Sequence, residues 1–100
     1  MKDLPAKASA LSNAKRLQIL EWLKQPSQHF GPDQLVYEKE GVCGLCIAKK
    51  LGISPATASM HLKVLTRAGF VRPLRIGKYT YFRRIEKEIA EFVRLITKKI

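Results

Sequence analysis

The chain has 100 residues, of which 46% are hydrophobic, 27% charged and 8% aromatic, and its formal net charge is +11. This composition excludes a disordered chain, and the length allows one domain whose small core favours a second subunit. No stretch approaches the roughly 18 apolar residues of a membrane span, and the charged N-terminal segment lacks the apolar region of a secretion signal, so we expect a cytoplasmic protein without a membrane partner.

The positive charge is concentrated in one part of the chain. Residues 43–85 contain nine Lys and Arg and no Asp or Glu, so they carry nine of the eleven net positive charges. An acid-free stretch of this length indicates either a solvated basic face or a surface that binds a polyanion.

Two helices are predicted at the start of the chain. Apolar residues at helical spacing predict a first helix over about 3–11. A second helix follows, with Ser12 or Asn13 as its N-cap and Pro26 as its end.

Residues 25–41 form the next segment, in which two prolines and two glycines surround the stretch Gln-Leu-Val-Tyr. This composition predicts a long loop with one short strand. Its His29 is interpreted as a loop histidine rather than a metal ligand. No role for this loop follows from its sequence.

A helix-turn-helix is predicted over about 44–68. The first helix ends at a tight turn at Gly52, and Ser54 is a suitable N-cap for the second, with Pro55 at its first position. The buried face of the second helix consists of residues at helical spacing, Ala58, Leu62 and Leu65.

A β-hairpin is predicted over about 70–84, because two stretches rich in Val, Tyr and Phe flank a glycine-containing turn. Its cations make it a basic wing and are Arg72, Arg75, Lys78, Arg83 and Arg84. A last helix over about 85–99 has one broad apolar stripe, which is too wide for a lone small domain to cover.

The second helix of the helix-turn-helix carries polar and cationic side chains opposite its buried face. A helix in this position enters the major groove, where its outward side chains contact base edges and phosphates. The outward side chains are predicted to be Ala56, Thr57, Ser59, Met60, His61, Lys63 and Arg67. Helix-turn-helix units also serve as protein-interaction modules, but the adjacent basic wing favours DNA.

Residues 51–84 contain Leu-Gly-Ile-Ser, Ser-Met-His-Leu-Lys-Val-Leu, Ala-Gly-Phe-Val and a wing that ends in Tyr-Phe. With these motifs the segment resembles the ArsR-type winged helix-turn-helix regulators of bacteria. The resemblance implies a homodimeric transcriptional repressor with a mainly α (α+β) fold of about five helices and a two- or three-stranded wing, in one domain over 1–100. The first and last helices would form the dimer interface, and a symmetric dimer would bind an inverted repeat of double-stranded DNA.

The resemblance also implies site residues. Thr57, Ser59 and His61 would read DNA, while Arg75 and Lys78 would reach the flanking groove. The full predicted DNA-binding set is Ser54, Ala56, Thr57, Ser59, Met60, His61, Lys63, Arg67, Arg75, Lys78 and Tyr79. The predicted dimer interface is Leu4, Ala8, Leu11, Ile89, Phe92, Val93 and Ile96.

Cys43 and Cys46 precede the helix-turn-helix and are the chain's two cysteines. Metal sensors of the resembled family often place Cys-x-Cys followed by Asp here, whereas this chain has Leu45 at the second cysteine and Cys46 at the acid. We therefore expect no metal cofactor. A metal-sensing repressor remains an alternative, in which His29, His61 or carboxylates of a second chain complete the ligands.

A thiol-based sensor is a further alternative. A cysteine at a helix N-terminus near Lys49 and Lys50 is expected to be partly thiolate, so Cys43 could be oxidised or could bind a thiophilic ligand together with Cys46. Two inert, half-buried thiols are the third interpretation.

Two other classes of function would require different sequence features. A thioredoxin-type enzyme would place Cys-x-x-Cys in a βαβ unit, and the chain has no such pattern, so we expect no enzymatic activity. A basic RNA-binding protein would need aromatic side chains for stacking, and Tyr79, Tyr81 and Phe82 suit hairpin packing equally well. The sequence identifies neither an inducer nor an operator.

Overall fold

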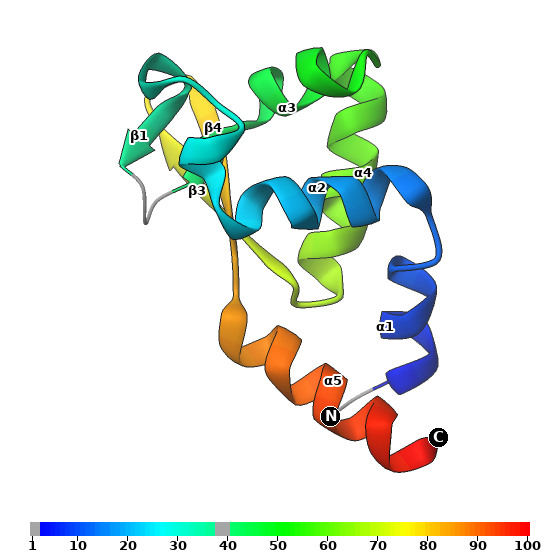
Figure 1. Ribbon diagram of the computed structural model, residues 1–100. Coiled ribbons are helices and arrows are strands. Elements are labelled where there is room, and N and C mark those ends of the chain that lie inside the picture. Colours follow the sequence, from blue (N-terminus) through cyan, green and yellow to red (C-terminus); the bar gives the residue numbers. More distant parts are fainter. Residues whose placement is uncertain (1–2, 38–40) are drawn as a thin grey trace.

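A computed structural model describes residues 3–37 and 41–100 (Figure 1). The α-helices in this part of the chain are α1 (Leu4–Ala10), α2 (Ala14–Lys24), α3 (Gly44–Leu51), α4 (Pro55–Arg67) and α5 (Glu86–Lys99). Two single 3₁₀ turns, η1 (Pro26–Gln28) and η2 (Pro32–Gln34), lie between α2 and the sheet. The strands are β1 (Leu35–Tyr37), β2 (Gly41–Cys43), β3 (Val71–Ile76) and β4 (Tyr79–Arg84). The five predicted helices and the predicted hairpin are confirmed.

Side-chain caps fix where the helices begin. Asn13 caps α2, because its side-chain oxygen accepts hydrogen bonds from the amides of Lys15 and Arg16. Ser54 caps α4 by accepting from the amide of Thr57, and Pro55 occupies the first helical position as predicted. Each such cap stabilises a helix by about 1 kcal/mol.

The sheet is larger than the predicted two- or three-stranded wing. Within residues 3–37 and 41–100 it has four antiparallel strands in the order β1-β2-β4-β3. The predicted wing is the β3–β4 pair, and β1 and β2 extend it into a larger sheet; each has three residues, too few for an alternating pattern to be recognised in the sequence. Only the β1 strand was expected within the loop 25–41.

The hydrophobic core lies between α2, α3, α4 and one face of the sheet. Its fully buried side chains include Ile19, Ile47, Leu65 and Phe70. The loop before the sheet also contributes, because Phe30 is buried there and meets the ring of Trp22 edge to face at 6.0 Å between centroids.

The terminal helices α1 and α5 contact each other at the end of the molecule opposite α3 (Figure 1). The molecule is elongated, with principal extents of 41 × 25 × 23 Å. Phe92 attaches α5 to the core, where its ring lies 5.3 Å from that of Phe70. Val93 on the same helix is 52% exposed.

Among the described residues, the helices are all too short or too polar to cross a membrane.

Candidate DNA-binding surface

The outer face of α4 is exposed as predicted, with one exception. Exposed side chains on this helix include Ala56, Thr57, Ser59, Met60, Lys63 and Arg67. The first part of the helix therefore presents short hydroxyl groups and one thioether, and its second part presents cations. This order suits base edges at the N-terminal end and phosphates towards the C-terminal end.

The hydroxyl of Thr57 is held in place by the helix cap. Ser54 Oγ accepts from the Thr57 amide at 3.1 Å and donates to Thr57 Oγ1 at 2.9 Å. Since Thr57 Oγ1 is the acceptor in the second bond, its own proton remains available for an acceptor on DNA. The cap thus both starts the helix and orients a predicted reading residue.

His61 is the exception, and its predicted exposure was wrong. It is 5% exposed and belongs to the buried face of α4 with Ala58, Leu62 and Leu65. Its Nδ1 lies 3.0 Å from a guanidinium nitrogen of Arg16 on α2. The spacing of 58, 61, 62 and 65 is that of one helical face, but a polar residue at such a position is easily read as outward-facing.

The protonation of His61 follows from its surroundings. Burial lowers the pKa of the imidazole first, and the positive charges of Arg16 and Lys15 lower it further. A guanidinium can only donate, so Nδ1 must act as an acceptor and the ring is neutral with its proton on Nε2. His61 is therefore a support of α4 within the protein.

The outer side of the wing is exposed and basic. Arg72, Arg75, Lys78 and Tyr79 are exposed, and the Arg75 side chain donates through Nε to the carbonyl of Gly77 at 2.9 Å. This contact folds Arg75 over the β3–β4 turn.

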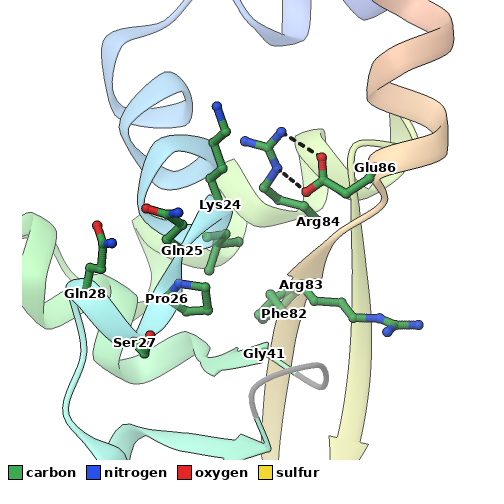
Figure 2. A pocket seen from close by; sticks show the side chains of 11 residues that line it. Lys24, Gln25, Pro26, Ser27, Gln28, Gly41, Phe82, Arg83, Arg84 and Glu86 are labelled. Carbon is green, nitrogen blue, oxygen red and sulfur yellow. Dashed lines mark hydrogen bonds and ion pairs between the residues drawn. The ribbon is translucent and has the colours of Figure 1, made fainter.

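Arg84, at the base of the wing, has a structural role instead. It forms a bidentate ion pair with Glu86, with N–O distances of 2.8 and 3.0 Å, and donates to the carbonyl of Leu20 at 3.0 Å. Figure 2 shows this pair at the edge of a hollow of about 430 Å³ between the end of α2, η1 and β4. Arg84 thus joins β4 to α2 and α5.

The reading helix and the wing enclose a smaller hollow of about 260 Å³. Ser59 of α4 and Lys78 and Tyr79 of the wing line it, together with Cys43 and Leu45. Predicted DNA-binding residues from two separate elements therefore lie on one continuous surface.

The cysteines lie at the start of α3. Cys43 is the last residue of β2 and the N-cap of α3, and Cys46 is in the first turn; both are free thiols. Burial raises the pKa of Cys46, the charge and hydrogen bond of Cys43 raise it further, and a hydrogen bond with Gln34 opposes this shift. Cys46 is accordingly a protonated thiol at neutral pH.

The two lysines expected to act on these thiols lie at the other end of α3. Lys49 and Lys50 are in its last turn, about 9 Å or more along the helix axis from Cys43. Lys50 Nζ lies over the rings of Trp22 and Phe30, at 5.2 and 5.5 Å from their centroids. The predicted activation of Cys43 by these lysines stays a prediction.

Residues 3–37 and 41–100 contain no group of three or more His, Cys, Asp and Glu side chains arranged to hold a metal ion.

Comparison with known proteins identifies the family of the chain. Residues 47–73 match a family described as a helix-turn-helix domain. The chain is 45% identical over 92 residues to the uncharacterized HTH-type transcriptional regulator YbzH of Bacillus subtilis, covering 91% of this chain and 92% of that protein. It is also similar to the homodimeric winged helix-turn-helix DNA-binding domain of a possible ArsR-family transcriptional regulator from Mycobacterium bovis, with a TM-score of 0.64 and 28% identity. That match covers 94% of this chain and 77% of the other.

This chain belongs to the ArsR-type winged helix-turn-helix transcriptional regulators. An ArsR-like transcriptional regulator from Rhodococcus sp. RHA1 shares the fold, with a TM-score of 0.68 at 21% identity over 96% of this chain and 77% of that one. In this ArsR-type chain the matched helix-turn-helix segment contains all of α4 and the start of β3.

Sequence reasoning missed the part played by Arg16. This residue is 45 positions from His61, and nothing in the sequence of α2 singles it out. No local spacing signals such a contact. The position of His61 on the buried face of α4 is the one pattern that could have indicated a buried partner.

Proposed function

We propose that this protein is a dimeric repressor that binds an inverted-repeat DNA operator through α4 and the wing. The observation that carries the proposal is the exposed polar face of α4 beside a basic wing, within a stretch of 43 residues that has no acidic side chain. Such a surface attracts the phosphate backbone, and its short polar groups suit base edges. The protein acts by binding rather than by catalysis.

Each part of the surface has a distinct proposed task. Thr57, Ser59 and Met60 contact base edges in the major groove, where the Met60 side chain, 48% exposed, suits the methyl group of thymine. Lys63 and Arg67 contact phosphates. Arg72, Arg75, Lys78 and Tyr79 contact the backbone and groove on the flank.

The dimer is proposed to form through α1 and α5. Val93 of α5 is exposed, and five apolar side chains on or directly after these two helices are half-buried: Leu4, Ala8, Leu11, Ile89 and Ile96. Phe92 is excluded from this set because its own chain buries it against Phe70. These helices lie opposite α3, so two copies would present their α4 helices on one side of the DNA, with half-sites about one helical turn apart.

The proposal also includes a signal that acts on the two thiols. Cys43 ends the strand that leads into α3, so linking Cys43 to Cys46 would distort the helix that braces α4. Oxidation would remove two protons and two electrons from the pair and pass them to an oxidant such as a peroxide. The raised pKa of Cys46 predicts that this reaction is slow at neutral pH.

The test begins with a DNA site selected by the purified protein from a random duplex pool. Binding to this site and to random duplex DNA is followed by fluorescence anisotropy over a range of salt concentrations. We expect Lys78→Ala to weaken binding to both DNAs and to lower the salt slope by about one, because one phosphate contact is lost. Thr57→Ala and Ser59→Ala are expected to weaken the selected site by about 1–3 kcal/mol each and to leave random DNA nearly unaffected.

Selection of no site, or equal losses on both DNAs for every variant, would refute sequence-specific binding by α4. Sedimentation equilibrium of wild type and Val93→Glu tests the dimer: the wild type should sediment as a dimer and the variant as a monomer. The thiol signal is tested by measuring how wild type binds the selected site with and without peroxide. Cys43→Ser is the matched control.

A further inference from the structure

One arginine side chain connects three helices. Arg16 is in the first turn of α2, and its amide donates to the cap residue Asn13. Its Nε donates to the carbonyl of Ala10 at 2.6 Å, and one of its terminal nitrogens lies 3.0 Å from His61 Nδ1. The guanidinium therefore joins the end of α1 to the middle of α4.

Both ends of this connection are fixed. Ala10 is the last residue of α1 and is buried, and its carbonyl is one of those that a helix leaves without an internal partner at its C-terminal end. His61 is buried and neutral, and its ring accepts from Arg16. A planar guanidinium offers its donors in a rigid fork, so the two bonds together restrict how α4 can turn or slide relative to α1.

The two ends of the connection have different proposed tasks. α1 contacts α5, at the end of the molecule proposed to form the dimer. His61 follows directly after Ser59 and Met60, which are proposed to read bases. Recognition geometry tolerates errors of only about 0.5 Å, so a small rotation of α4 would move these side chains out of register with the bases.

We propose that Arg16 and His61 are positioning residues for DNA reading, through which α1 sets the orientation of α4. This inference rests on the proposed function, since it concerns how the DNA-reading surface is held. Apolar contacts of Ala58, Leu62 and Leu65 bind α4 to the core, and the Arg16–His61 bond selects the orientation among those that such non-directional contacts allow.

The test compares two substitutions of His61. His61→Leu fills the same buried space without an acceptor, whereas His61→Asn places a carbonyl oxygen near the position of Nδ1. Arg16 is half-buried and can turn to water, so neither change leaves a buried charge stranded. Arg16→Gln removes the fork, and Lys24→Gln removes one exposed charge from the same helix as a control.

We expect His61→Leu and Arg16→Gln to weaken binding to the selected site about tenfold or more while binding to random duplex changes less than about twofold. His61→Asn and Lys24→Gln should stay within about threefold of wild type on both DNAs. Retained affinity in His61→Leu would overturn the proposal, and so would equal losses in His61→Leu and His61→Asn.

A second measurement does not depend on DNA. Residual dipolar couplings of backbone amides report the axis of α4 relative to those of α1 and α5 in wild type and in each variant. The axis should shift in His61→Leu and Arg16→Gln and stay in place in His61→Asn; an unchanged axis in His61→Leu overturns the proposal. If wild type selects no DNA site, the proposed function fails, and the couplings alone decide whether these residues position the helix.

Discussion

Gly41 is a position at which even alanine, which adds one methyl group, should strongly destabilise the fold. Its φ is 100°, a left-handed conformation that an L side chain rarely adopts. A Cβ atom added there would lie 2.0 Å from the carbonyl oxygen of Phe82 and 2.9 Å from the amide nitrogen of Arg83, which are both backbone atoms of β4. No side-chain movement relieves such contacts, so Gly41→Ala must separate β2 from β4.

The magnitude follows from two contributions. The positive φ costs about 1–2 kcal/mol for alanine. Separation of the strands removes hydrogen bonds at the pairs Val42↔Phe82 and Cys43↔Tyr81, each worth about 1 kcal/mol. We therefore expect Gly41→Ala to lower the free energy of unfolding by about 3–4 kcal/mol, against a total of about 5–15 kcal/mol for a domain of this kind.

Urea unfolding followed by circular dichroism measures this loss, and thermal unfolding should show a midpoint lowered by at least about 12 °C. Gly52→Ala is the matched control, because its φ of 72° is also positive but an added Cβ meets no atom within 4 Å. It should lose only the conformational contribution of about 1–2 kcal/mol. Equal destabilisation by the two substitutions would refute the argument from close approach.

Three further predictions concern side chains inside the fold. The pKa of His61 in the folded protein lies below its unfolded value of 6.5, so the unfolded chain binds more protons below that pH. The contribution of His61 to stability should therefore be fully present above pH 6.5 and be lost as the pH decreases below it. Urea unfolding at pH 5 and 7.5 measures this dependence, which should shrink in His61→Asn. Alkylation of Cys46 by iodoacetamide in Cys43→Ser, followed by mass spectrometry, should be slower at pH 7.5 than that of a cysteine in an unfolded peptide. Partial burial is the largest cause of the raised pKa of Cys46, and it persists in this variant; an equal rate would contradict the raised pKa. Arg84→Ala should lower the free energy of unfolding, measured by urea unfolding, by about 1–3 kcal/mol, since the carbonyl of Leu20 on α2 loses the Arg84 donor. Glu86→Gln should have a smaller effect, because the glutamate side chain is 66% exposed.

The helices were predictable because their signals are local. Asn13, Ser54 and Pro55 mark helix starts through bonds made within three residues, and the apolar spacing of α4 gave Ala58, Leu62 and Leu65 correctly. The β3–β4 hairpin was predictable for the same reason, since its strands have six residues each and flank a short turn.

The errors concern contacts between distant parts of the chain. β2 pairs with β4, about 40 residues later, and three residues carry no pattern that predicts such pairing. His61 and Arg84 were placed on the surface because polar residues usually lie there, yet each is satisfied by a partner from a distant element. Burial of a polar side chain depends on whether such a partner exists, and sequence spacing does not report it.

Trp22 gives the molecule an intrinsic fluorescent reporter. It is the chain's single tryptophan, and its ring on α2 contacts the ring of the loop residue Phe30 and the ammonium group of Lys50 on α3. Its emission therefore arises from one junction, where the bracing helix of the helix-turn-helix meets the rest of the core. A spectral change on adding DNA or an oxidant would report movement of α3 without an attached dye, and Lys50→Gln would show how much of the signal comes from the cation.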